Sequence, residues 1–165
     1  MPDSGLLQEW GRLMAGKWKI QSATPGEGGA LAISSGSHTI SWMEGGSALE
    51  AKCSSPSVAG AASATPESRW VAVYDTASGQ IKQTTVNADG TTDVAYIGKK
   101  NGQWGWNQTR TFPNGATETN CAEFVVSDGG KTITQHVTKR VLTHPDAVGG
   151  PLALSETCNV LTQVS

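Results

Sequence analysis

The sequence has few charged residues and no long apolar run. Charged residues make up 16% of the chain, against about 25% in an average soluble domain, and the formal net charge is -2 at pH 7. The 12 Lys and Arg residues are scattered along the chain without a cluster, which argues against a nucleic-acid partner. No apolar run approaches the roughly 20 residues of a membrane-spanning helix, and the N-terminus has no basic segment followed by an apolar one. We therefore expect a cytoplasmic protein without a membrane partner.

Cysteine is scarce, and metal and phosphate motifs are missing. Cys53, Cys121 and Cys158 are odd in number, far apart and outside any CxxC pair, so we expect reduced thiols. The three histidines lack metal-ligand spacing, and no glycine-rich phosphate loop precedes a helix. We therefore expect neither a metal ion nor a cofactor.

Turn signals recur at regular spacing in the second half of the chain. Glycines at positions 79, 90, 102, 115 and 129, each preceded by Ser, Asp or Asn, are separated by 11, 12, 13 and 14 residues. Asn-Gly and Asp-Gly supply the positive φ angles that tight hairpins require. The segments between them are rich in Thr, Val, Tyr and Trp, which favour strands. Five such turns predict six consecutive antiparallel strands.

The rest of the chain predicts one helix, more strands and two loops. Residues 4–15 carry apolar side chains at helical spacing and are followed by Gly16, which predicts a short helix. Residues 31–54 predict two or three strands with a turn at Gly45-Gly46. The small, polar and proline-bearing segment 54–68 predicts a long loop or lid. The segment 143–165 predicts a loop followed by a last strand or an arm on the outside.

Short strands in sequence order favour a closed barrel, because closure removes exposed edges. The segment "LMAGKW", with Gly16 and Trp18, resembles the Gly-x-Trp that opens the first strand of lipocalins and related calycins after a short helix. The order of elements is also similar to that of a group of uncharacterised bacterial lipocalin-like domains. The resemblance implies a cup-shaped barrel with an internal cavity, and it implies that an arginine of a late strand, here Arg140, covers Trp18.

The predicted fold class is therefore all-β: one domain over residues 1–165, formed by an antiparallel up-and-down lipocalin-like barrel of eight to nine strands with one N-terminal helix. Such barrels serve both binding proteins and enzymes. Function must be argued from the side chains that line the cavity.

Hairpin geometry assigns side chains to the two faces of the sheet, because cross-strand partners share a face. Two-residue turns at Asn101-Gly102 and Asn114-Gly115 place Asp93 opposite Arg110, Cys121 opposite Gln108 and Glu123 opposite Trp106. A four-residue loop over 127–130 places His136 beside Cys121.

Two tryptophans at alternate positions are more economically buried than exposed, so we assign their face to the interior. It collects the following residues: Asp93, Ile97, Trp104, Trp106, Gln108, Arg110, Cys121, Glu123, His136 and Arg140. The strand 37–44 adds His38 and Trp42 to the lining. The opposite face holds apolar Phe124, Ile133 and Val137, and a single bulge would invert the assignment beyond it.

The interior set mixes aromatic and ionisable groups, as a ligand cavity does. His136 with Glu123 is either an acid and base pair or a histidine bonded to Thr or water. Arg110 with Asp93 is either an anion anchor or an ion pair at the rim. Cys121 is either a nucleophile or an inert thiol. Trp104 and Trp106 are either a stacking surface or plain core.

Two functions follow from this interpretation. In the first, the barrel binds a small, largely apolar, cyclic or aromatic molecule and performs cofactor-independent proton transfer as an isomerase, cyclase or lyase. His136, Glu123, Arg110 and Asp93 would be its catalytic residues. The ligand-binding residues would be Trp42, Ile97, Trp104, Trp106, Gln108, Cys121 and His38. In the second, the barrel is a non-catalytic carrier for the same ligand class, and a homodimer is left open in either case.

Overall fold

The computed structural model describes residues 5–25, 31–58, 67–146 and 149–164. One helix, α1 (Gly5–Met14), precedes the strands, close to the predicted bounds, and it buries Leu7, Trp10 and Met14. Gly16 then starts the first strand with a φ of 140°, a backbone conformation that residues with a Cβ atom rarely adopt. This glycine lets the chain turn directly from helix to strand.

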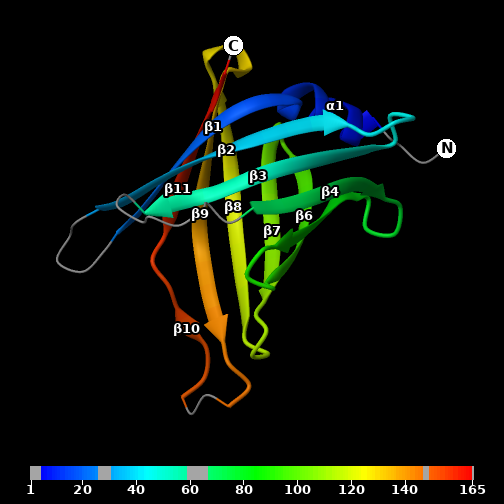
Figure 1. Ribbon diagram of the computed structural model, residues 1–165. Coiled ribbons are helices and arrows are strands. Elements are labelled where there is room, and N and C mark those ends of the chain that lie inside the picture. The colour runs from blue at the N-terminus through cyan, green and yellow to red at the C-terminus, as the bar shows by residue number, and fades with distance from the viewer. Residues whose placement is uncertain (1–4, 26–30, 59–66, 147–148, 165) are drawn as a thin grey trace.

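Eleven strands follow in the described part of the chain, and ten of them form a closed antiparallel barrel (Figure 1). Strands β1 to β9 pair in sequence order, β9 pairs with β11, and β11 pairs with β1. The short β10 pairs with the end of β9. The bounds are β1 (Gly16–Pro25), β2 (Leu31–Trp42), β3 (Ala48–Val58), β4 (Glu67–Asp75), β5 (Gln80–Asn87), β6 (Thr92–Lys100), β7 (Gln103–Thr111), β8 (Thr117–Ser127), β9 (Thr132–Thr143), β10 (Leu152–Ala153) and β11 (Thr157–Gln163).

The predicted fold class is confirmed, although the ring has more strands than the expected eight or nine. Of the two alternatives for the C-terminal segment, the last strand is observed: β11 pairs with β9 and β1 and completes the ring. The predicted loop over 54–68 is shorter than expected, because β3 continues to Val58 and β4 begins at Glu67. Its centre, residues 59–66, lies outside the described residues.

The predicted positions of the turns are confirmed. The glycines at positions 45, 46, 79, 90, 102, 115 and 129 all have φ angles between 65° and 92°. The last five separate the predicted consecutive strands, β4 to β9, from one another, and the first two lie between β2 and β3.

The register of the β7–β8 hairpin differs from the prediction by one residue. The Phe112 N–H donates to the Ala116 carbonyl at 2.9 Å, so three residues form the loop instead of two. Gln108 therefore lies opposite Asn120, and Trp106 lies opposite Ala122. A one-residue shift exchanges the faces of a strand. The prediction that Cys121 and Glu123 face the interior is wrong.

A bulge on β9 exchanges faces a second time. Cys121 pairs with Lys139 and Ala122 with Val137, so Thr138 is an extra residue on β9. As a result Val137 and Arg140, three positions apart, both line the barrel interior. His136 lies on the outer wall of the barrel and is exposed. The prediction that it faces the interior beside Cys121 is wrong.

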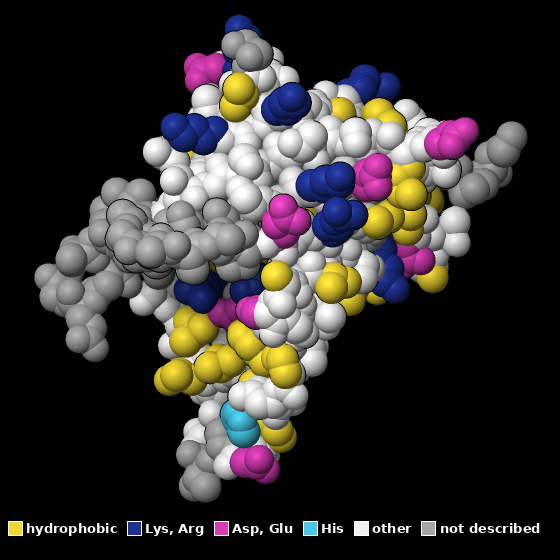
Figure 2. Space-filling view, viewed as in Figure 1, with side chains coloured by type: hydrophobic (Ala, Val, Ile, Leu, Met, Phe, Trp, Pro, Cys, Tyr) yellow, Lys and Arg dark blue, Asp and Glu magenta, His cyan; other side chains and the backbone are white. Residues whose placement is uncertain are grey.

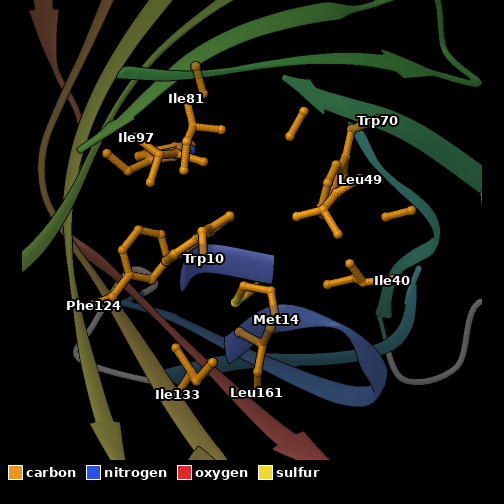
Figure 3. Close-up of a cluster of buried hydrophobic side chains, with 14 of the residues drawn as sticks. Trp10, Met14, Ile40, Leu49, Trp70, Ile81, Ile97, Phe124, Ile133 and Leu161 are labelled. Carbon is orange, nitrogen blue, oxygen red and sulfur yellow. The ribbon is translucent and has the colours of Figure 1, made fainter. Parts of the chain in front are cut away.

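The helix closes one end of the barrel with an apolar plug. Trp10 contacts Trp104 and Phe124, with ring centroids 4.8 and 5.2 Å apart, and Figure 3 shows Trp10 and Met14 among side chains from many strands. The Trp18 indole N–H donates to the Met14 carbonyl at 2.8 Å. Arg140 lies at the other end of the barrel, so the expectation that it covers Trp18 is wrong.

The outer surface mixes charges of both signs. Figure 2 shows Lys and Arg side chains interspersed with Asp and Glu over the face it presents, without a region of one sign. Among the described residues, no helix is long and apolar enough to cross a membrane.

Candidate functional site

Two cavities inside the barrel, between the helix plug and the opposite end, are lined by described residues. The larger, which we call the mouth chamber, has a volume of about 320 Å³. Its lining consists of Trp106, Gln108, Arg110, Glu118, Asn120, Gln135, Val137, Arg140, Thr157 and Asn159. The smaller, the floor chamber, has about 80 Å³ and shares Trp106 and Gln135 with the mouth chamber.

The mouth chamber, at about 320 Å³, is smaller than a groove of about 550 Å³ on the outer wall, but it is the larger of the two cavities inside the barrel. A volume of this size is at the lower end of the range of small-molecule sites. Eight of its ten lining residues carry polar side chains, and Trp106 and Val137 supply the apolar wall.

An ion pair lies on the wall of the mouth chamber between β6 and β7. The Arg110 Nε and Nη2 atoms donate to Asp93 Oδ1 and Oδ2 at 2.8 and 3.2 Å. The two residues are cross-strand partners, as predicted. Asp93 is only 2% exposed. Burial acts to lower the pKa of Arg110, but the hydrogen bonds and charge of Asp93 outweigh it, so that the pKa is raised and the guanidinium stays charged.

A second ion pair joins β8 to β9. Arg140 Nη2 donates to Glu118 Oε1 at 2.8 Å, and Arg140 Nη1 donates to the Ser155 carbonyl and to Thr157 Oγ1. Two arginines and two carboxylates therefore stand at this end of the barrel, and their formal charges cancel.

Two pairs of carboxamides complete the lining. Asn120 Nδ2 donates to Gln108 Oε1 at 3.1 Å, and Asn159 Nδ2 donates to Gln135 Oε1 at 2.8 Å. Asn120 is 6% exposed, and its Oδ1 atom is buried and has no hydrogen-bond partner among the described residues. Such an acceptor is costly to leave unpaired.

The floor chamber is mostly apolar, with His38 on its wall. Trp70, Ile97 and Phe124 line it together with His38. Burial lowers the pKa of His38 to about 4, so that the imidazole is neutral at pH 7. Burial also raises the pKa of the neighbouring Cys53 thiol to about 11, which keeps it protonated.

The structure brings several predicted site residues together inside the barrel. Trp106, Gln108 and Arg110 line the mouth chamber, and Asp93 holds Arg110. His38 and Ile97 line the floor chamber. Trp104 and Trp42 also point inward, but they contact the helix: Trp104 packs against Trp10, and Trp42 packs so closely that a Cβ atom on Gly11 would lie 2.0 Å from its ring.

The remaining predicted residues lie on the outer wall. Glu123 and His136 are direct cross-strand partners there, and Cys158 of β11 lies opposite His136 on its other side. Cys121 and Glu123 line the outer groove, whose floor is formed by the facing glycines Gly98 and Gly105. The expected pairing of Glu123 with His136 thus exists, but it does not face the cavity.

Sequence reasoning missed Glu118, Asn120, Gln135, Thr157 and Asn159. The two-residue turn, which puts Cys121 and Glu123 on the inner face, assigns the alternate residues Glu118 and Asn120 to the outer face. Pro113 is the signal that could have corrected this, because proline has no N–H to donate and cannot close that turn as predicted. Among the described residues, no group of three or more His, Cys, Asp or Glu side chains is arranged to hold a metal ion.

Comparisons with known proteins place the barrel among solved structures. No protein-family model and no curated protein matches the sequence. The structure is similar to that of the S-type phycobiliprotein lyase CPES from Guillardia theta, with a TM-score of 0.60, covering 96% of this chain and 93% of that chain. The two sequences are 8% identical, so the likeness concerns the fold.

Proposed function

We propose that the protein binds a small, neutral, ring-containing molecule in the mouth chamber and acts as a binding or carrier module. The observation that carries this proposal is a polar chamber of about 320 Å³ at the end of the barrel opposite the helix. A packed core would avoid so many polar side chains, since each needs a partner when buried.

The walls of the chamber favour a ring with polar groups on its edge. Trp106 offers an aromatic surface against which a planar ring can pack. The carboxamides and guanidinium groups around it offer hydrogen bonds that would orient the ring. The expectation of a largely apolar ligand is therefore narrowed to one whose ring is apolar and whose edge is polar.

The balance of charges favours a neutral ligand. Arg110 is bonded to Asp93 and Arg140 to Glu118. A carboxylate or ammonium group on the ligand would have to compete with one of these pairs, and breaking a buried pair is costly because it leaves a charge unpaired.

Binding without chemistry is the better supported of the two functions. Glu123 and His136, which we expected to act as acid and base, lie on the outer wall. Asp93 and Glu118 are held by arginines. The resemblance to lipocalins and the likeness to CPES, a phycobiliprotein lyase by name, support a barrel of the ligand-binding kind, and the ligand class rests on the chamber itself.

Nuclear magnetic resonance of the ¹⁵N-labelled protein tests the proposal. Side-chain NH₂ signals of Gln108, Asn120, Gln135 and Asn159 report on the chamber, and the backbone signals of Glu123 and His136 report on the outer wall. Titration with a collection of neutral ring compounds should shift the first set in a saturable way. If no compound shifts the chamber signals, or compounds shift only those of the outer wall, the proposal is wrong.

A further inference from the structure

The mouth chamber contains a hydrogen-bonding pair that the protein itself leaves incomplete. Asn120 and Gln108 face each other on β8 and β7. The single bond between them uses the Asn120 donor and the Gln108 acceptor. It leaves Asn120 Oδ1 and Gln108 Nε2 without a partner in the described part of the chain.

We infer that this pair recognises a lactam or carboxamide edge, meaning an adjacent N–H and C=O on one side of the ligand ring. The inference rests on the proposed function and names the ligand class for the same chamber. The ligand N–H donates to Asn120 Oδ1, and the Gln108 Nε2 group donates to the ligand carbonyl.

Burial makes the acceptor selective. Asn120 is 6% exposed, so its free oxygen has little access to bulk solvent. Leaving a buried acceptor unpaired costs more free energy than a typical hydrogen bond contributes to stability. A ligand that brings an N–H to this atom removes the cost, and a ligand with a methyl group at that position cannot.

The neighbouring groups do not compete for this role. Arg140 directs its donors to Glu118, Ser155 and Thr157, and Arg110 directs two of its donors to Asp93. On the other wall Gln135 and Asn159 form a second amide pair at 2.8 Å, but neither is as buried as Asn120. The Gln108–Asn120 pair is therefore the part of the chamber where a buried acceptor, Asn120 Oδ1, is available to an N–H group of a ligand.

The probes are 2-quinolone, a neutral bicyclic lactam, and N-methyl-2-quinolone, which keeps the ring and the carbonyl but has no N–H. Dissociation constants are measured by NMR titration of the full-length chain. We expect 2-quinolone to bind at least about tenfold more tightly than its N-methyl derivative. Equal affinity of the two probes in the chamber would overturn the inference and leave the proposed function standing.

Variants link the preference to Asn120. Asn120→Leu should reduce the ratio of the two dissociation constants to about one. Asn120→Asp keeps an oxygen acceptor and should retain the preference for the lactam, which also covers the case in which the leucine variant does not fold. Asn107→Leu, an exposed position on the same strand as Gln108, is the matched control and should leave the ratio unchanged.

The remaining outcomes distinguish failure of the inference from failure of the proposed function. If neither quinolone binds while other neutral rings shift the chamber signals, the inference is wrong and the proposed function holds. If no ring compound of any kind shifts those signals, the proposed function fails, and the inference falls with it.

Discussion

At the scale of single residues, the ion pair between Arg140 and Glu118 shows how the polar end of the barrel is stabilised. Glu118 is 4% exposed, and Arg140 is its cationic partner. Removing one member of a buried pair is more harmful than removing both, because the survivor keeps its desolvation cost without its partner.

We therefore expect Arg140→Met to lower the free energy of unfolding by about 3 kcal/mol. The double variant Arg140→Met/Glu118→Leu should recover roughly half of that loss or more. Urea denaturation of the wild type, both single variants and the double variant completes the cycle. Additive losses would contradict the assigned coupling.

His38 gives the stability a dependence on pH. Its pKa is about 4 in the folded protein and 6.5 when unperturbed, because burial disfavours the charged form. The unfolded chain therefore binds the extra proton first as the pH falls. This contribution is fully present above about pH 6.5 and is lost as the pH falls from there to about 4.

Over that interval the free energy of unfolding should fall by up to about 3 kcal/mol through His38 alone. Denaturation curves at several pH values should show a shallower dependence in His38→Gln than in the wild type. His136→Gln, at an exposed histidine on the outer wall, is the control and should behave as the wild type does. Parallel profiles for all three proteins would count against a neutral His38 in the folded protein.

At the scale of elements, α1 fits the barrel only because Gly11 has no side chain. A Cβ atom at this position would lie 2.0 Å from Cζ2 of Trp42, well inside van der Waals contact. Alanine favours a helix over glycine by about 1 kcal/mol, but overpacking a core costs about 1 to 3 kcal/mol. We expect the cost of the clash to exceed the gain in helix propensity.

We expect Gly11→Ala to be destabilising by about 1 kcal/mol or more in chemical denaturation. Arg12→Ala, at the next and exposed position of the same helix, should have little effect. In a Trp42→Leu background, where the ring is gone, Gly11→Ala should become neutral or stabilising. A stabilising effect in the wild-type background would show that the helix does not press on Trp42.

The bulge on β9 predicts which deletion the sheet tolerates. Thr138 is the extra residue, so deleting it leaves Val137 opposite Ala122 and Arg140 opposite Asn120 in an uninterrupted ladder. Deleting Thr134 instead would shift every residue on one side of the cut to the other face.

We expect the Thr138 deletion to fold with a cooperative thermal transition and the Thr134 deletion to be unfolded or strongly destabilised. Circular dichroism and thermal unfolding distinguish the two. If the Thr138 deletion also fails to fold, the bulge is needed for the curvature of the barrel and is not a tolerated insertion.

The loop after β7 and the bulge on β9 explain how much of the site could be predicted. Regular Asn-Gly and Asp-Gly turns predicted strands β4 to β9, and the turn at Asn101-Gly102 placed Asp93 opposite Arg110 correctly. The loop at Pro113 and the bulge at Thr138 each moved later residues to the other face. Pro113 carried a readable signal, but the bulge had only an indirect one, the apolar Phe124, Ile133 and Val137 on the face assigned to solvent.

At the scale of the whole molecule, the barrel has one apolar end and one polar end. The helix plug and its aromatic contacts fill the first, and the mouth chamber occupies the second. This division explains why Trp104 and Trp42 serve the core, whereas Trp106 is positioned to contact a ligand.

The most direct test of the account compares two phenylalanine substitutions at adjacent positions on β9. Val137 lines the mouth chamber, and Thr138 lines the outer groove that also holds Cys121 and Glu123. The measurement is the dissociation constant of a ring compound identified by the NMR titration, in variants whose folding is verified by their thermal transitions. We predict that Val137→Phe, which fills the chamber, weakens binding at least about tenfold, and that Thr138→Phe changes it less than about twofold. The reverse result, with binding lost in Thr138→Phe and retained in Val137→Phe, would place the ligand on the outer wall and contradict the account.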